Sequence, residues 1–110
     1  MSMKDYMKDI KDHDLAALKQ ADAISVLVFS ANWCPDCLFI EPFMERLVHK
    51  YQQYTFYYVD RDEHIELAQE WMIMGIPSFV AIGKGQELGR FVSKLRKSEA
   101  EIDAFLASLQ

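Results

Sequence analysis

The stretch Ala31-Asn32-Trp33-Cys34-Pro35-Asp36-Cys37 holds both cysteines of this 110-residue chain, separated by two residues. Residues 24–29 before it are rich in apolar, β-branched and aromatic side chains, which predicts a buried strand. Apolar residues recur at helical spacing over 38–51, so we expect the chain to turn from strand to helix at the cysteines. Pro35 suits a first helical turn, where a proline costs no hydrogen bond. Cys34 would then lie beside unpaired backbone N–H groups, whose partial positive charge favours a thiolate.

Composition predicts one globular domain over residues 1–110. Apolar residues make up 51% of the chain and charged residues 26%, which is typical of a folded protein. The net charge of −5, without a basic stripe, argues against binding to nucleic acid or to an anionic membrane. Charges throughout the first twenty residues argue against a secretory signal, and no apolar run reaches the ~20 residues that span a bilayer. We therefore expect a cytoplasmic protein whose cysteines serve redox chemistry or metal binding.

The remaining pattern predicts an α/β domain. Three further strands are expected, at residues 54–59, 78–82 and 88–92. A short helix is predicted at 65–72, and a final helix follows a capping box at Ser98. This order implies a mixed sheet covered on both faces, with its first two strands parallel and its last two joined as a hairpin.

The first twenty residues give the least decisive pattern. Met3, Tyr6 and Ile10 share a helical face, so we expect residues 1–20 to be mostly helical. The alternative is an extended arm followed by a shorter helix that begins at Asp12 or His13.

A structural zinc site is disfavoured by the number of ligands. Such a site needs four ligands, and besides the two cysteines the chain offers only His13, His49 and His64. These histidines lack the paired spacing of a zinc finger, so we predict neither a metal nor another cofactor.

The sequence resembles thioredoxin along nearly its whole length. The resemblance rests on Trp33-Cys34-Pro35-Asp36-Cys37, on Pro42 within the following helix, on Gly75-Ile76-Pro77-Ser78 and on Lys84-Gly85 in the predicted hairpin. It implies a three-layer α/β/α thioredoxin fold and a dithiol–disulfide oxidoreductase. The implied substrates are disulfide-containing proteins or small molecules, and the implied electron donor is a reductase or a low-molecular-weight thiol.

The resemblance also implies a role for each site residue. Cys34 would be the exposed nucleophile, and Cys37 the more buried thiol that resolves the mixed disulfide. Ile76 would offer its backbone to an extended peptide, and a cis Pro77 would lie against the sulfurs. Trp33 would form an apolar wall beside Cys34; the alternative is a lone surface aromatic.

Three positions depart from the family pattern. Val28 stands where many thioredoxins have a buried aspartate, and Phe56 where they have a lysine. We therefore expect an apolar pocket beneath Cys37, which would raise the pKa of this thiol. Ser93 replaces a glycine beside the site. These departures do not change the expected redox chemistry. They argue against assigning the family's usual reductase as the partner.

Asp36, between the cysteines, is expected to face water. At an assumed ~7 Å and an effective dielectric of ~40, its charge would repel the Cys34 thiolate by about 1 kcal/mol. This repulsion would make the protein a better reductant. The alternative is that Asp36 only favours the first helical turn.

Two other functions remain open at this point. One is a thioredoxin-like binding module with little turnover, and the other is a glutaredoxin-like enzyme that uses a low-molecular-weight thiol.

Overall fold

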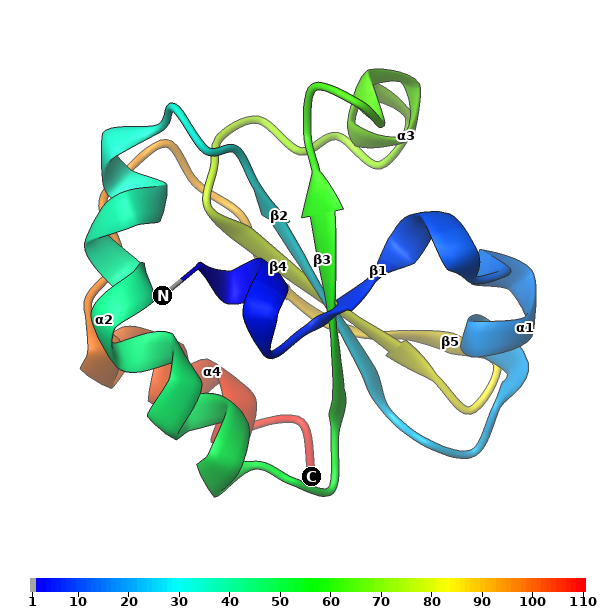
Figure 1. The fold of residues 1–110 in the computed structure, drawn as a ribbon. Helices are drawn as coiled ribbons and strands as arrows, with labels where there is room; N and C mark the ends of the chain where they lie inside the picture. Colours follow the sequence, from blue (N-terminus) through cyan, green and yellow to red (C-terminus); the bar gives the residue numbers. More distant parts are fainter. Residues whose placement is uncertain (1) are drawn as a thin grey trace.

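A mixed sheet of five strands lies at the centre of the structure, a computed structural model that describes residues 2–110 (Figure 1). The strands are β1 (Lys8–Asp9), β2 (Ser25–Ser30), β3 (Thr55–Asp60), β4 (Ser78–Gly83) and β5 (Gln86–Phe91). They lie in the order β1-β3-β2-β4-β5, in which β1, β3 and β2 are parallel and β4 is antiparallel to both neighbours. The predicted parallel pair and hairpin are confirmed, and every predicted strand is present within two residues of its expected ends.

Four α-helices cover the sheet in the described residues, two on each face (Figure 1). They are α1 (Leu15–Gln20), α2 (Pro35–Lys50), α3 (Ile65–Glu70) and α4 (Glu99–Ala107). Helices α2 and α4 pack on one face, and α1 and α3 pack on the other. The three-layer α/β/α architecture is therefore as predicted. No helix within residues 2–110 is both long and apolar enough to cross a bilayer.

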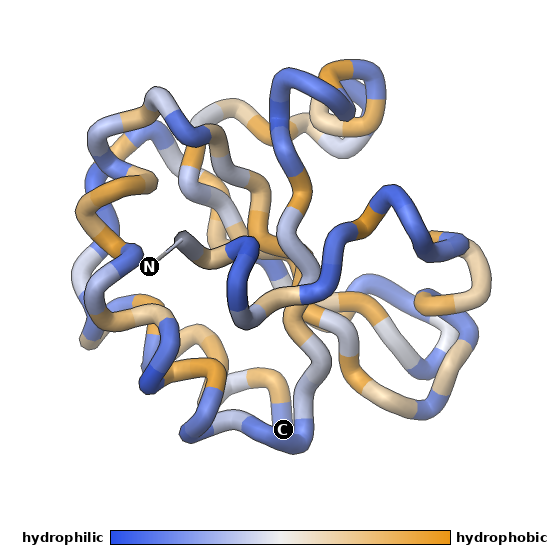
Figure 2. Tube along the Cα trace, viewed as in Figure 1, coloured by the Kyte–Doolittle hydropathy of each residue, from blue (hydrophilic) through white to orange (hydrophobic). Residues whose placement is uncertain are grey.

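The alternation of side chains along β2 builds both cores. Val26 and Val28 point into the core beneath α2 and α4, whereas Leu27 and Phe29 point into the core beneath α1 and α3. All four side chains are fully buried, and Figure 2 shows the hydrophobic centre with polar residues gathered at the turns. β2 therefore lies inside the sheet, and its carboxyl end delivers the cysteines to the edge of both cores.

Residues 2–20, the described part of the segment expected to be mostly helical, form short helical pieces rather than one helix; Met1 lies outside the described residues. Before α1, the chain forms the 3-10 turns η1 (Met3–Asp5) and η2 (Ile10–Asp12), with β1 between them. The alternative of a short helix after an extended arm is closer, although α1 begins only at Leu15, with Asp14 as its N-cap.

Burial on two opposite faces explains this segment. Met3 packs in the core beneath α2, and Ile10 packs in the core on the other face of the sheet. The chain must therefore pass around the sheet edge between them, which a continuous helix would not allow. It passes as β1, whose Lys8 and Asp9 pair with Tyr57 and Tyr58 of β3.

Two local signals in the second half of the chain have different outcomes. Ser98 forms the predicted capping box with Glu101 at the start of α4. The start of α3 lacks such a cap: His64 is its N-cap and makes no side-chain capping bond. Asp60 instead accepts hydrogen bonds from the backbone N–H groups of Asp62 and Glu63, so it stabilises the turn before the helix.

Candidate active site

Cys34 lies at the junction of β2 and α2, where it is the N-cap of the helix. Its Sγ accepts a hydrogen bond from the backbone N–H of Cys37 over 3.3 Å. Pro35 is the first helical residue and so leaves no N–H unpaired, while Asp36 adds an acidic side chain to the first turn. The predicted turn from strand to helix is confirmed. A backbone donor therefore points at Sγ of Cys34 and stabilises negative charge there.

The expectation that Cys34 is exposed is wrong for the side chain as a whole. Only 5% of its surface is accessible, against 1% for Cys37. Ala31, Cys37 and the half-buried Ile76 pack around it, because the loop before β4 closes over the helix start. Cys34 is still the more accessible of the two thiols.

Cys37 is a weakly acidic thiol. Burial is the main cause that raises its pKa to about 12, and its hydrogen bond with Cys34 adds to this rise. A hydrogen bond with the Ser30 side chain acts in the opposite direction. Val28, at the family's usual aspartate position, is fully buried. The predicted rise in the pKa of Cys37 is therefore present, with desolvation as its cause.

The pocket beneath Cys37 is less apolar than predicted. Phe56 and Val28 are apolar, but the hydroxyl-bearing Ser30 and Tyr58 are buried beside them on the same side of the sheet. Burial raises the pKa of Tyr58 to about 12, so its phenol is neutral near pH 7. The hydroxyl groups of Ser30 and Tyr58 therefore lie in a region where only apolar side chains were expected.

The loop before β4 forms the opposite wall of the site. The peptide bond between Ile76 and Pro77 is cis. The thiol of Cys34 donates a hydrogen bond to the Ile76 carbonyl, with 3.8 Å between sulfur and oxygen. Gly75 leaves room for a neighbouring segment, because a Cβ there would lie 2.3 Å from the carbonyl oxygen of Ser93. The sulfur of Cys34 therefore lies between a backbone donor on α2 and a backbone acceptor on this loop.

Trp33 stands beside the cysteines as an exposed but anchored side chain. Its accessible fraction is 57%, and its Nε1–H donates a hydrogen bond to Oδ2 of Asp62 over 2.6 Å. The guanidinium of Arg61 lies 5.6 Å from the ring centre. The hydrogen bond from Trp33 is the main cause that lowers the pKa of Asp62. Trp33 is thus not a lone surface aromatic, because the turn after β3 fixes its orientation.

The segment of residues 93–97 contributes two basic side chains that sequence reasoning missed. Arg96 donates from Nε to Oδ1 of Asp36 over 2.8 Å, so Asp36 is paired rather than simply facing water. Lys97 is buried, with 1% of its surface accessible. In sequence both belong to a polar run before a helix, and no local pattern distinguishes them from solvated charges.

Three exposed apolar side chains lie next to residues of the site in the sequence. They are Trp33 beside Cys34, Met74 beside Gly75 and Leu95 beside Arg96, with accessible fractions of 57%, 64% and 75%. Single exposed apolar residues are common, but apolar side chains near a reactive thiol offer contacts to an apolar partner. Met74 and Leu95 were not predicted, because isolated apolar residues in loops give no sequence signal.

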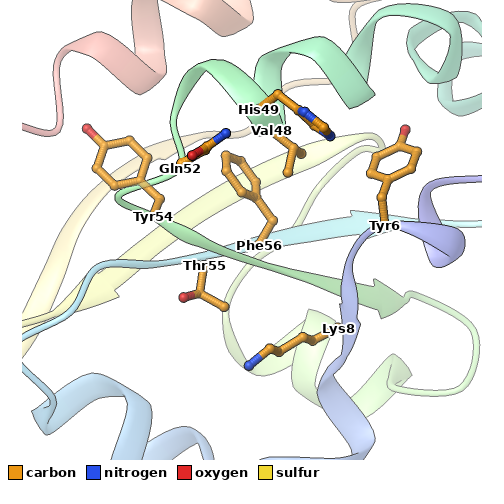
Figure 3. A pocket seen from close by; sticks show the side chains of 8 residues that line it. All are labelled: Tyr6, Lys8, Val48, His49, Gln52, Tyr54, Thr55 and Phe56. Atoms are coloured by element: carbon orange, nitrogen blue, oxygen red, sulfur yellow. The ribbon is translucent and has the colours of Figure 1, made fainter.

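Two other features lie outside this site. No group of three or more His, Cys, Asp or Glu side chains in residues 2–110 is arranged to hold a metal ion. A cavity of about 320 Å³ is lined by Tyr6, Lys8, His49 and Phe56, among others (Figure 3). It lies at the carboxyl end of α2, whereas the cysteines lie at the amino end of this 16-residue helix. The cavity is therefore separate from the thiols.

Comparison with known proteins identifies the family. The thioredoxin family model matches residues 7–108. The chain is 38% identical to thioredoxin from Callithrix jacchus over 100 residues, which cover 89% of this chain and 95% of that one. It is also 38% identical to "Thioredoxin-2, mitochondrial" of Schizosaccharomyces pombe over 72 residues, which cover 66% of this chain but only 54% of the relative.

A solved structure gives the same answer. The thioredoxin of Fasciola hepatica superimposes with a TM-score of 0.71 at 28% sequence identity, over 82% of this chain and 84% of that one. The sheet order, the two covered faces and the Cys34–Cys37 pair at the start of α2 agree with this likeness. The chain therefore belongs to the thioredoxin family, a family of thiol–disulfide oxidoreductases.

Proposed function

We propose that this protein reduces disulfide bonds of proteins or small molecules by thiol–disulfide exchange at Cys34 and Cys37. The observation that carries the proposal is the placement of the Cys34 sulfur. It accepts the N–H of Cys37 at the start of α2 and lies 3.8 Å from the carbonyl of Ile76. A thiolate at that position is stabilised by the helix terminus and lies next to a backbone edge that a substrate peptide would use.

The reaction proceeds in two exchanges. The Cys34 thiolate attacks one sulfur of the substrate disulfide, a Cys34–substrate bond forms, and the other substrate sulfur leaves as a thiolate. Cys37 then loses its proton and attacks the sulfur of Cys34. The Cys34–Cys37 bond forms and the second substrate sulfur is released. Two electrons pass from the protein dithiol to the substrate.

The surroundings of Cys34 suit an extended peptide substrate. The half-buried Ile76 would pair its backbone with the peptide in the manner of an added strand, with Pro77 beneath it. Trp33, Met74 and Leu95 would contact apolar side chains on either side of the substrate disulfide. Backbone pairing and apolar contact carry little sequence information, which favours a range of protein substrates.

The proposed electron donor is a reductase or a low-molecular-weight thiol, and the proposed location is the cytoplasm. Cytoplasmic reductants keep thiols reduced, which a disulfide-reducing protein requires. Because one relative is named as mitochondrial, cell fractionation followed by detection of the protein tests this location. We also propose that residues 1–110 function as one thioredoxin-like domain, without bound metal or organic cofactor.

Insulin reduction tests the proposed activity. The wild-type protein should accelerate precipitation of the insulin B chain with dithiothreitol as the reductant, and Cys34→Ser should abolish the acceleration. Cys37→Ser should accumulate a mixed disulfide with the substrate, which mass spectrometry detects. Replacing dithiothreitol by glutathione, or by a thioredoxin reductase with its nucleotide, identifies the class of donor.

The same assay separates the two alternatives. Folded wild-type protein that binds a substrate peptide but does not accelerate its reduction would be a binding module. Activity with glutathione but with no reductase would indicate the glutaredoxin-like alternative.

A further inference from the structure

Lys97 is the one charged side chain within residues 2–110 that is buried. Burial of an ammonium group is unfavourable unless its charge is compensated. The other buried polar residues in this part of the chain are serines, and Lys97 forms no ion pair with any described carboxylate. The buried Lys97 ammonium therefore has to be stabilised by groups other than a carboxylate in direct contact.

Neutral groups hold the ammonium in place. Nζ of Lys97 donates hydrogen bonds to the carbonyl oxygens of Ser93 and Leu95, both over 3.1 Å. The ring centre of Phe91 lies 5.4 Å from the same nitrogen. Two carbonyl dipoles and an aromatic face stabilise a cation without neutralising it. The ammonium is thus held in a fixed position by uncharged groups.

The segment that carries Lys97 is fastened against the active site at two points. The carbonyl of Ser93 lies against Gly75, which precedes the loop that contacts Cys34. Arg96 pairs with Asp36 in the first turn of α2. In Figure 1 this segment, coloured orange, passes behind the first turns of α2. A chain of contacts therefore links the Lys97 ammonium to the Cys34 sulfur, through the Ser93 carbonyl, Gly75 and the Ile76 carbonyl.

The charged groups around Lys97 are consistent with this position. Burial is the main cause that lowers its pKa, and Asp36, Cys37, Glu101 and Cys34 each act to raise it. Two of these four groups are the cysteines themselves. Attraction between opposite charges is mutual, so a charged Lys97 would favour negative charge on the sulfurs, against the burial that dominates at Cys37.

We propose that Lys97 is the internal cation of the redox site, a positioning residue that stabilises negative charge on the Cys34 and Cys37 sulfurs. This inference rests on the proposed reductase function. Val28 and Phe56 stand where many thioredoxins carry an aspartate and a lysine. Within residues 2–110, the buried cation is instead Lys97, and no carboxylate is buried with it. Lys97 exchanges no proton. Its ammonium stabilises the Cys34 thiolate before the first attack and the Cys37 thiolate before the second, while the Cys37 proton passes to water or to the departing substrate thiolate.

The effect on the redox equilibrium has a definite sign. The oxidised Cys34–Cys37 pair is uncharged, so Lys97 stabilises only the reduced state, in which a thiolate is present. Removing the charge should therefore destabilise the reduced state and make the reduction potential more negative. A tenfold change in the equilibrium constant with glutathione corresponds to about 30 mV for a two-electron couple.

Lys97→Met tests the proposal, with Lys94→Met as the matched control. Both changes remove one positive charge from residues 93–97, but Lys94 is exposed. Lys97→Met should slow alkylation of Cys34 at pH 7 by about tenfold and shift its pH profile upward by about one unit. It should also shift the glutathione equilibrium by up to tenfold toward oxidised protein. Equal effects of the two variants would overturn the proposal.

A second measurement requires no variant and decides the question if Lys97→Met does not fold. Because coupling between two sites is reciprocal, the pKa of the Lys97 ammonium should be higher in the reduced protein than in the oxidised protein. NMR of the lysine Cε and Nζ nuclei across a pH titration measures both values. An identical pKa in the two redox states would contradict the proposal.

These outcomes are distinct from a failure of the proposed function. A protein that does not reduce insulin, yet shows the shifted alkylation profile in Lys97→Met, would retain the internal cation and lose the reductase assignment.

Discussion

The Nε of Arg96 donates a hydrogen bond to Oδ1 of Asp36 over 2.8 Å, although sixty positions separate the two residues in the chain. The Arg96 guanidinium also lies 4.4 Å from the ring centre of Phe39, one turn further along α2. Asp36 therefore does not act on the cysteines as an isolated negative charge. The Asp36–Arg96 pair reduces the repulsion that the sequence alone predicts between Asp36 and the Cys34 thiolate.

Charge variants of this pair should act in opposite directions. Asp36→Asn should speed alkylation of Cys34 at pH 7 and make the reduction potential less negative, by at most about 20 mV. Arg96→Gln should slow alkylation, because it leaves the Asp36 charge uncompensated. The double variant should lie near the wild type. Measurement at low salt is required, and unchanged rates in both single variants would show that the pair does not tune Cys34.

The two thiols should differ in their reaction with an alkylating agent. In the reduced protein at pH 7, iodoacetamide should modify Cys34 and leave Cys37 unmodified, because burial raises the pKa of Cys37 to about 12. Mass spectrometry of peptides after timed quenching measures both rates. Equal rates in the folded protein would contradict the assignment of Cys34 as the nucleophile; the same experiment in denaturant is the control in which equal rates are expected.

Ser30 should assist the second exchange. Its hydrogen bond lowers the pKa of Cys37, so Ser30→Ala should raise this pKa further and slow resolution of the mixed disulfide. A hydrogen bond to a charged group contributes about 1.5–3 kcal/mol, which corresponds to a rate loss of roughly tenfold or more. Single-turnover kinetics with a fluorescent peptide disulfide measures this step. Ser25→Ala, at the other end of β2, is the control and should leave the rate unchanged.

Acid should destabilise the attachment of α4. Arg46 pairs with Glu99, and Lys50 and Tyr51 bind Asp103, so α4 is tied to α2 through carboxylates. These partners lower the pKa of both Glu99 and Asp103.

The sign of the pH dependence follows from these lowered pKa values. A group with a lower pKa in the folded state binds more protons when unfolded, so its stabilisation is present above the unfolded pKa and is lost as the pH falls through the folded pKa. The free energy of unfolding should therefore stay level near neutrality and decrease below about pH 4.5, the ordinary value for glutamate. Urea unfolding at a series of pH values measures this decrease. Glu99→Gln should show a shallower decrease, and an equally steep one would exclude Glu99 from the effect.

Gly75→Ala should disturb the site through the backbone. The new Cβ would lie 2.3 Å from the Ser93 carbonyl oxygen, so residues 93–97 have to move away from the loop before β4. We expect a loss of about 1–3 kcal/mol in the free energy of unfolding, together with slower insulin reduction. Gly89→Ala is the control, because the nearest atom there is a Leu109 methyl carbon at 3.0 Å, which rotates away more readily. Equal losses in both variants would argue against a specific contact at Gly75.

Local patterns were sufficient to predict the central elements and the reactive pair. Residues 24–29 and 54–59 are apolar runs long enough for buried strands, and Cys34 with Pro35 marks the start of a helix whichever way the domain is packed. Ser98 and Glu101 form a capping box from chemistry within four residues. Each of these features depends on neighbours along the chain, so the sequence by itself determined them.

The contacts that surround the cysteines depended on tertiary structure. Folding brings distant segments together at three places: Arg96 pairs with Asp36, Trp33 binds Asp62, and Lys97 is buried against the Phe91 ring. The two residues of β1 likewise form a strand only because β3 offers them a free edge. A charged residue in a loop has the same local signature whether it is solvated or buried. Only the folded chain fixes its neighbours, and these neighbours decide its charge interactions and its effect on the thiols.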